Sequence, residues 1–262
     1  MALRLRPPTR PRGWYGVLAV LVAGELLCRS GLVPTRALPP PSDVVRTLGL
    51  ELAGRRLWTD LGSTLSAWAI GLALAGACAV PLGVAIGSSR ILRRSVHLLV
   101  EFMRPIPPVA FLPVVVLVSG TGLRSAVFLV FVASLWPLLI QTVYGVLDAD
   151  PIAIETAVSY RIRRTDRFLR VTMPGAAPYL ATGFRLASSA ALTLAVSAEL
   201  VLGAPGLGRT IQLAGAGGSI SLMYAYILVT GLVGWAQNGL LVRVQHRSLR
   251  WQVSSPPLEA GS

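Results

Sequence analysis

The chain has 262 residues, of which 53% are hydrophobic and 13% charged, and its mean hydropathy of +0.66 exceeds what the surface of a soluble domain tolerates. All 24 basic residues are arginine, and together with 11 carboxylates they give a formal net charge of +13. Such an excess suggests either nucleic acid or a membrane as partner. The arginines cluster in short segments between long apolar runs, which favours a membrane protein and excludes a nucleic-acid-binding face.

A membrane-spanning helix needs about 20 mostly apolar residues, and the stretches that qualify are 13–33, 61–87, 96–118, 125–147, 180–203 and 222–242. The first is the weakest, because Glu25 and Arg29 interrupt it. A cleaved signal peptide is the alternative there, and the missing small-residue cleavage pattern after Leu27 favours retention. The sequence therefore predicts an all-α, polytopic membrane helical bundle of about six transmembrane helices.

The distribution of arginines predicts the orientation of this bundle. With the N-terminus inside the cell, sixteen arginines fall in cytoplasmic segments and seven in outer segments. Five of the seven lie in one long loop between Arg29 and Arg56, and long translocated loops follow the positive-inside rule less strictly. We therefore expect a multi-pass protein of the bacterial cytoplasmic membrane with both termini in the cytoplasm.

The chain divides into three parts by composition. Residues 1–56 are expected to form an N-terminal tail, the first span and a Pro/Arg-rich outer loop, residues 57–250 a transmembrane domain, and residues 251–262 a cytoplasmic tail. Prolines such as Pro81 and Pro137 lie within spans, and broken helices survive in lipid only where protein or a water-filled cavity satisfies the freed backbone groups. This favours a bundle packed around a pathway, with the stretch from Arg104 to Pro113 irregular or kinked near the cytoplasmic surface.

Cysteine and histidine point to no chemistry. Cys28 and Cys78 lie in apolar stretches without a second ligand at zinc spacing, so we expect small core residues and no metal site or disulfide. His97 and His246 stand alone beside arginines and are interpreted as interfacial residues.

The longest inside loop, 148–178, is too polar to span a membrane and is patterned like two short amphipathic helices. We expect Pro174 and Pro178 to end the second of these helices. A compact helical loop at the cytoplasmic face is suited to receive force from another protein. The alternative is a loop that rests on the membrane surface and binds anionic lipid through its arginines.

This loop resembles the cytoplasmic signature of the inner-membrane permeases of binding-protein-dependent ABC importers. That signature is Glu-Ala-Ala, three residues, Gly, nine residues, a hydrophobic residue, one more, Leu and Pro. Glu155, Thr156 and Ala157 stand in the first three places, and Pro174 stands at the end with Val171 and Met173 in the hydrophobic places.

The resemblance implies that the loop contains the coupling helix, which docks in a groove of the ATPase subunit, and that Thr156 and Ala157 allow close approach. The residues implied in docking are Glu155, Thr156, Ala157, Ser159, Tyr160, Arg161, Arg163 and Pro174. Arg161 departs from the signature, because it replaces a glycine that normally supplies a positive-φ turn. If the left-handed conformation is kept, arginine costs about 1 kcal/mol there; otherwise the turn differs or an ion pair rebuilds the contact.

Similarity to the nitrate, sulfonate and taurine branch of this family extends from about residue 61 to 251. It rests on the segments DLGSTLSAW, RPIPPVAFLPVVVLVSGTG, LWPLLIQTVYGV, PYLATGFRLA, SAELVLGAPGLG and RSLRW. It implies a type I importer in which two permease subunits work with two ABC ATPase subunits and an extracytoplasmic solute-binding protein. Two identical permease subunits, a homodimer, are the simpler expectation. ATP and Mg would bind the ATPases, and the solute would be a small anion such as a sulfonate, taurine or nitrate.

One segment imitates a nucleotide site. GAPGLGRT at 203–210 matches the phosphate-binding pattern except that Arg209 replaces the lysine, and the whole chain has no lysine. The motif also needs a preceding strand, whereas this segment follows a predicted span and faces outside. We therefore expect a Gly-rich loop that closes the outer end of the fifth span. Because a chain without lysine has no orthodox phosphate-binding loop, energy from ATP has to come from another subunit.

A transport pathway is predicted along the fifth span. At about 100° per residue, one stripe within about 40° of Arg185 holds Ser189, Leu192, Val196 and Glu199. Arg185 and Glu199 are about 21 Å apart along the helix and cannot pair. Arg185 would attract an anion or fix the inner gate, and Glu199 would close the outer gate through Arg124 or Arg209; alternatively, both charges snorkel to the nearest interface. The other candidate pathway residues are Ser134, Trp136 and Gln141.

Two other classes of membrane protein fit the sequence less well. A secondary transporter driven by an ion gradient predicts midplane carboxylates in repeated halves, and neither is present. An intramembrane enzyme predicts paired active residues inside spans, and no Ser–His, Asp–Asp or His–Glu set occurs there. The sequence thus predicts a transport subunit that performs no chemistry itself.

Overall fold

The computed structural model describes residues 12–31, 37–103 and 105–248, and the predicted tails lie outside these ranges. The described residues form helices and turns without strands. In chain order the helices are α1 (Arg12–Arg29), α2 (Pro41–Ala53), α3 (Arg55–Ser88), α4 (Arg90–Met103), the 3-10 turn η1 (Pro108–Phe111), α5 (Leu112–Ser119), α6 (Leu123–Leu147), α7 (Pro151–Ser159), α8 (Arg164–Arg167), the π-helical turn η2 (Phe168–Thr172), α9 (Met173–Leu202), α10 (Leu207–Ala216) and α11 (Ile220–Ser248).

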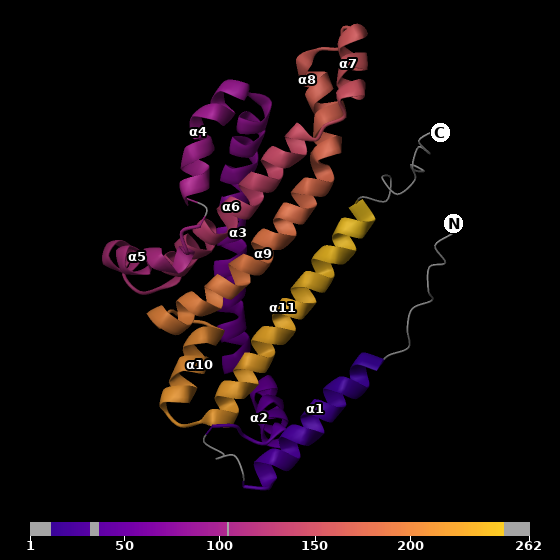
Figure 1. Cartoon of the computed structure of the whole chain (residues 1–262). Coiled ribbons are helices and arrows are strands. Elements are labelled where there is room, and N and C mark those ends of the chain that lie inside the picture. Colours follow the sequence, from indigo (N-terminus) through magenta and orange to yellow (C-terminus); the bar gives the residue numbers. More distant parts are fainter. Residues whose placement is uncertain (1–11, 32–36, 104, 249–262) are drawn as a thin grey trace.

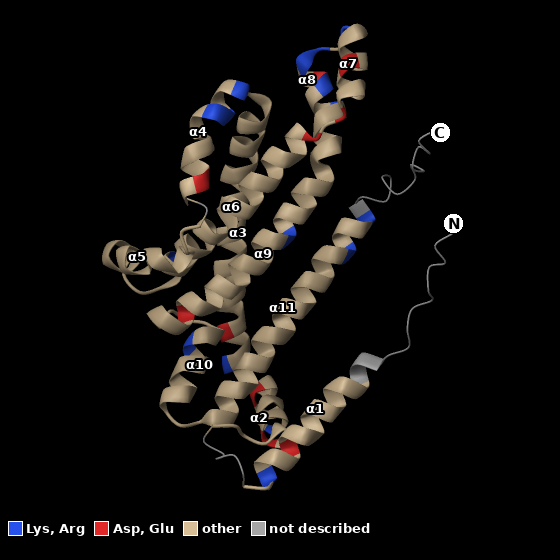
Figure 2. Ribbon diagram, viewed as in Figure 1, with Lys and Arg blue, Asp and Glu red and all other residues tan. Residues whose placement is uncertain are grey.

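The long helices run side by side between two ends of the molecule (Figure 1). α7 and α8 project at one end, the loop end, where α3 finishes and α4 begins; α10 and α2 lie at the opposite end, the α10 end. Arginines on α4, the α7–α8 loop and the last turns of α11 lie toward the loop end (Figure 2). This arrangement agrees with a multi-pass bundle.

Four helices are long and apolar enough to span a membrane: α3, α6, the continuous stretch Arg164–Leu202 and α11. The expected span 96–118 is instead two helices, α4 and η1–α5, which meet at 83°. Together they correspond to a broken span or a re-entrant loop, and the break between Met103 and Pro108 falls in the stretch Arg104–Pro113, where an irregular or kinked segment was expected. α1 corresponds to the expected first span but carries Arg12, Glu25 and Arg29 within 18 residues.

The expectation that Pro174 and Pro178 end a helix is wrong, because α8, η2 and α9 form one continuous helix. Pro174 follows directly on the π-helical turn, where the wider winding leaves room for the ring. Neighbouring helices can satisfy the carbonyl groups that proline leaves without a donor. The predicted Pro/Arg-rich loop also contains a helix, α2, which starts at Pro41 because proline fits the first turn.

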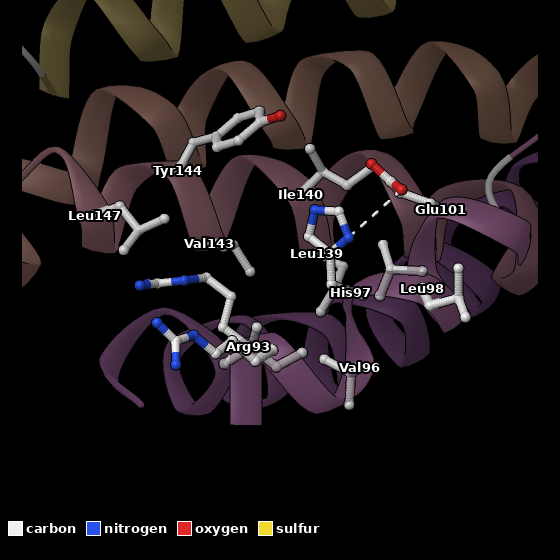
Figure 3. A pocket seen from close by; sticks show the side chains of 13 residues that line it. Arg93, Val96, His97, Leu98, Glu101, Leu139, Ile140, Val143, Tyr144 and Leu147 are labelled. Atoms are coloured by element: carbon white, nitrogen blue, oxygen red, sulfur yellow. Dashed lines mark ion pairs between the residues drawn. The ribbon is translucent and has the colours of Figure 1, made fainter. Parts of the chain in front are cut away.

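α6 is the centre of the bundle and packs along both α3 and α9. A cavity of about 600 Å³ remains between α6 and α4 (Figure 3). Small residues allow the close approach of the long helices. A Cβ at Gly83 of α3 would lie 2.6 Å from Cβ of Thr142, and a Cβ at Gly145 of α6 would lie 2.8 Å from Cβ of Tyr179.

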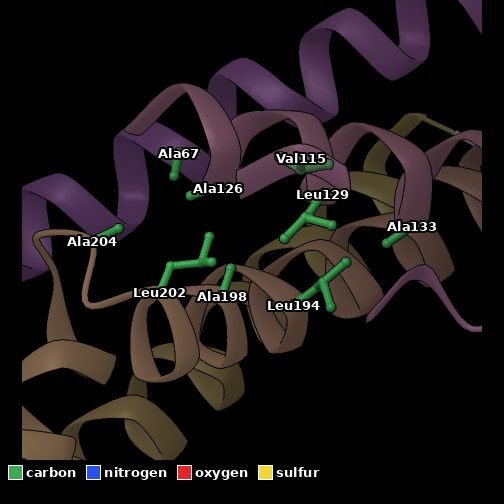
Figure 4. Packing of buried hydrophobic residues seen from close by; sticks show 9 residues of the cluster. All are labelled: Ala67, Val115, Ala126, Leu129, Ala133, Leu194, Ala198, Leu202 and Ala204. Carbon is green, nitrogen blue, oxygen red and sulfur yellow. The ribbon is translucent and has the colours of Figure 1, made fainter. Parts of the chain in front are cut away.

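Toward the α10 end the core consists mostly of alanine and leucine (Figure 4). Ala67 from α3, Ala126 and Leu129 from α6 and Ala198 from α9 are buried together there. A polar contact adds to this packing: the Ser188 carbonyl of α9 accepts hydrogen bonds from Trp68 Nε1 at 3.2 Å and Gln237 Nε2 at 2.9 Å. Cys28 is buried as expected, but Cys78 is exposed on the bundle surface and not in the core.

Candidate functional site

The predicted docking loop is a compact helical hairpin. α7 begins where the Asp150 side chain accepts a hydrogen bond from the Ile152 amide at 2.9 Å, with Pro151 at the first helical position. The chain then turns at 160–163 and enters α8. Of the two predicted amphipathic helices, the first is α7 and the second is the start of the long helix that continues as α9.

The predicted docking residues lie on two sides of this hairpin. Glu155, Thr156, Ser159, Tyr160, Arg161 and Arg163 are exposed. Ala157 is 4% exposed and packs inside the hairpin, and Pro174 lies in the first turn of α9. Several apolar side chains at the projecting end are also exposed, namely Ile152, Val158, Tyr160 and Ile162.

Arg161 keeps the left-handed conformation that glycine supplies in the family signature. Its φ is +53°, which makes it the one positive-φ residue other than glycine in the described chain. The Ile162 amide donates to the Ala157 carbonyl at 3.0 Å, and the Arg161 amide donates to the Val158 carbonyl at 2.9 Å. These bonds close the end of α7 as a Schellman-type cap. The two alternatives were that the turn differs from that of the family or that an ion pair rebuilds the contact. The observed backbone excludes a different turn, and Arg161 makes no ion pair among the described residues.

The hairpin is tied to the bundle at its base. The Tyr179 hydroxyl of α9 donates to Asp148 Oδ2 at 2.7 Å. Ala149 is buried beside this contact, and the α6–α9 interface at Gly145 leaves no room for a side chain. The hairpin is thus attached directly to the ends of α6 and α9.

A second feature is a cavity of about 760 Å³ between α6, α9 and η1, called the α9 cavity below. Three of the predicted pathway residues line it: Trp136, Gln141 and Ser189. Sequence reasoning missed Thr193 and Ser197, which line the same wall. Their spacing of four residues from Ser189 was the available signal, because hydroxyls at i, i+4 and i+8 share one helix face.

The remaining pathway candidates lie elsewhere. Leu192 is buried on the side of α9 that faces Gly234 of α11, and Val196 packs against the cluster formed by α10, α11 and Leu57. Ser134 is buried and donates to the Ala187 carbonyl at 3.4 Å, while Arg185 is half-buried outside the lining of the cavity. The predicted stripe therefore covers two faces of α9.

Glu199 is fully buried at the α10 end, and its partners differ from the expected ones. Oε2 accepts hydrogen bonds from Thr64 Oγ1 at 2.9 Å and from the Gly208 amide at 3.0 Å, rather than from Arg124 or Arg209. Thr64 Oγ1 in turn accepts from the Leu207 amide at 3.0 Å. A carboxylate at this position caps the Gly208 amide in the first turn of α10 and interacts favourably with the helix dipole.

Glycine makes this capping arrangement possible. Gly206 has a φ of +152°, and a Cβ there would overlap the Glu199 carboxyl group. A Cβ at Gly208 would lie 2.8 Å from Cβ of Glu199. The segment that imitates a phosphate-binding loop follows a helix, and the chain's own carboxylate occupies the place where a phosphate would sit. Packing thus explains Gly206 and Gly208, whereas Gly203 ends α9 in the left-handed conformation with a φ of +67°.

The described residues contain no group of three or more His, Cys, Asp or Glu side chains that could hold a metal ion. The geometry provides an exposed hairpin attached to two long helices, a cavity with a polar wall, and a buried carboxylate that holds α10 against α9 and α3. The helix Arg164–Leu202 joins these three features, so another protein that binds the hairpin would contact the same helix that lines the cavity.

Comparisons with known proteins agree with this geometry. The sequence model described as "Binding-protein-dependent transport system inner membrane component" matches residues 79–250. The taurine transport system permease protein TauC of Escherichia coli (strain K12) is 30% identical over 243 residues, which cover 90% of this chain and 88% of that protein. The bicarbonate transport system permease protein CmpB of a Synechocystis species is 29% identical over 235 residues, which cover 84% of this chain and 82% of that protein.

A solved structure has the same fold. One chain of the MetNI methionine ABC transporter in an inward-facing conformation superposes with a TM-score of 0.64 at 19% identity. The superposition covers 74% of this chain and 95% of that chain.

Replacing Arg161 by glycine is expected to stabilise the hairpin. Glycine adopts the left-handed conformation without the penalty of a Cβ, which is about 1 kcal/mol. We expect the Ile162 amide to exchange with deuterium about fivefold more slowly in Arg161→Gly, and faster than wild type in Arg161→Val. Unchanged exchange in both variants would contradict the assigned strain.

Replacing Glu199 by alanine is expected to loosen α10. The change leaves the Gly208 amide and the Thr64 hydroxyl without their acceptor, which costs about 1–3 kcal/mol for each buried group. We expect faster deuterium exchange across residues 207–216 and unchanged exchange in α7. Glu199→Gln is the matched control, because its amide oxygen can still accept from Gly208, and its effect should be smaller.

Proposed function

The chain belongs to the family of binding-protein-dependent transport system inner membrane components and is a permease subunit of an ABC importer; from this premise we propose how it works and what it carries. The α7–α8 hairpin docks on a separate ABC ATPase, and the α9 cavity is part of the path of a small anion. The family match disfavours a secondary transporter driven by an ion gradient.

The carrying observation is the continuity of the helix from Arg164 to Leu202. At 1.5 Å per residue its 39 residues extend about 58 Å, from the docking hairpin to the Glu199 cap. The cavity wall with Ser189, Thr193 and Ser197 belongs to this same helix. A displacement of the hairpin by the ATPase would therefore move the wall of the cavity, which is the requirement for alternating access.

The chemistry of the hairpin supports docking on a protein. Ile152, Val158 and Tyr160 are exposed together with Arg161 and Arg163, so the surface offers apolar contacts with charges around them. Protein interfaces favour this combination of apolar, tyrosine and arginine contacts. In the proposed arrangement Glu155 contacts the ATPase, which binds ATP and Mg and hydrolyses the nucleotide.

The orientation follows from the arginines. Residues 90–94 and 161–170 carry eight arginines and lie toward the loop end, which we place in the cytoplasm. The α10 end then faces the extracytoplasmic solute-binding protein. A chain with its own complete docking hairpin also favours a homodimer of permease subunits.

The lining of the α9 cavity supports a small polar solute. It contains no charged side chain, and its polar groups are the Trp136 indole, the Gln141 amide and the three hydroxyls of α9. The indole and amide N–H groups make no hydrogen bond within the described chain and can donate to an anion. Relatives named for taurine and bicarbonate transport favour a small solute of this class. Neutral polar groups bind it weakly, so selection would rest mainly on the binding protein.

Reversal of the charge at Glu155 tests the docking assignment. We expect Glu155→Arg to reduce co-purification of the ATPase subunit at least tenfold, since a basic side chain would replace the carboxylate at the centre of the interface. Asp43→Arg, the same charge change in exposed α2 at the other end of the molecule, is the matched control and should retain the ATPase. Full recovery of the ATPase with Glu155→Arg would contradict the assignment.

Thiol labelling tests the pathway. After replacement of Cys28 and Cys78 by alanine, we expect Thr193→Cys to react at least tenfold faster with a negatively charged thiosulfonate than Leu192→Cys, which lies on the buried face of the same helix. A positively charged thiosulfonate should react more slowly than the negative one at Thr193→Cys. Equal labelling of the two positions would exclude this wall as the pathway.

A further inference from the structure

The cavity between α4 and α6, called the α4–α6 cavity, adjoins the α9 cavity at Ile140, which lines both, and plays no part in the function proposed above. It measures about 600 Å³. Its walls are mostly apolar and include Val143 and Leu147 of α6 and Leu98 of α4 (Figure 3). Two arginines, Arg93 and Arg94, also line it.

The charges in this cavity are separated along α4. Arg93 and Arg94 lie in the first two turns, and Arg93 Nη1 is held by a hydrogen bond of 3.4 Å to the Gly87 carbonyl. Arg94 is exposed and makes no ion pair within the described chain. Glu101 lies eight residues, or about 12 Å, beyond Arg93 along α4, and its Oε2 lies 3.5 Å from His97 Nδ1. The end of the cavity nearest the loop end is therefore positively charged.

The apolar part of the cavity extends away from this charged end, toward the middle of the membrane. Leu147, the last residue of α6, lies beside the loop end, whereas Val143 and Leu139 lie one and two helical turns before it and so further from the loop end. α4 also carries large apolar side chains that are exposed in the described chain, namely Ile91, Leu98, Leu99 and Phe102. These side chains would face lipid, so the cavity would open toward the bilayer with its arginines at the depth of the headgroups.

We propose that the α4–α6 cavity binds an anionic phospholipid from the surrounding leaflet. Arg93 and Arg94 hold the phosphate through charge-assisted hydrogen bonds, and an acyl chain lies along Leu98, Val143 and Leu147. The order of charged and apolar groups along the cavity matches the order of headgroup and chain in a lipid. A free phosphate would use the arginines but leave the apolar walls empty.

Native mass spectrometry of the full-length protein in neutral detergent tests this proposal. Dioctanoyl-phosphatidylglycerol is the anionic probe, dioctanoyl-phosphatidylcholine the zwitterionic one, and inorganic phosphate is added as a competitor. We expect wild type to bind the anionic lipid at least tenfold more tightly than the zwitterionic lipid. Inorganic phosphate at the same concentration should not displace it.

Variants locate the binding. Arg94→Gln should weaken binding of the anionic lipid about tenfold, because it removes a positive charge that would contact the phosphate. Arg94 is exposed and makes no ion pair within the described chain, so the fold should be unaffected. Val143→Trp should weaken it by filling the apolar wall, which keeps the test valid if one variant folds poorly. Arg243→Gln, an exposed arginine on α11 outside the cavity, is the matched control and should bind as wild type does. Equal binding of both lipids, displacement by inorganic phosphate, or wild-type binding in Arg94→Gln and Val143→Trp would overturn the proposal.

Discussion

Close packing of α6 against α3 and α9 is the constraint on which the rest of the structure depends. Within a bilayer there is no hydrophobic force between helices, so contact requires small residues at the interface. Gly83 and Gly145 meet this requirement on two faces of the bundle, and alanines do so toward the α10 end. Because the packing leaves no room for a Cβ at these points, α6 is held closely against α3 and against the start of α9 beside the hairpin.

Two polar contacts inside this packed bundle lie where α9 meets other elements. The Glu199 carboxylate holds α10, and the Ser188 carbonyl accepts from α3 and α11. Buried polar groups are costly in a membrane and persist where they are hydrogen-bonded or required for function. At the opposite end Arg161 retains a strained backbone conformation for a turn that glycine would make freely. Glu199 and Arg161 thus lie near the two ends of the helix that we propose as the connection between motor and cavity, and Ser188 lies within it.

The sequence predicted the elements that depend on local pattern. Long apolar runs located α3, α6, α9 and α11, and the signature spacing located the hairpin. It did not predict the continuity of the helix through Pro174, because that depends on a π-helical turn. The pathway stripe was centred on Arg185, the most conspicuous charge, whereas the cavity wall is centred on Thr193, about 80° further around the helix. The partners of Glu199 could not be predicted, since Thr64 lies 135 residues away in the sequence, on α3, and only the packing of α3 against α9 brings the two together.

The distribution of charge separates binding from passage in the proposed transporter. Arginines are concentrated at the loop end, and the lining of the α9 cavity carries no charge. A cation inside the cavity would hold an anion strongly and slow its release, since passage requires sites that an ion can leave as well as enter. Neutral donors such as the Trp136 indole can replace part of the hydration of an anion without trapping it. Net transport would then be driven by the ATPase and by the concentration that the binding protein delivers, and the permease would supply a path with alternating openings.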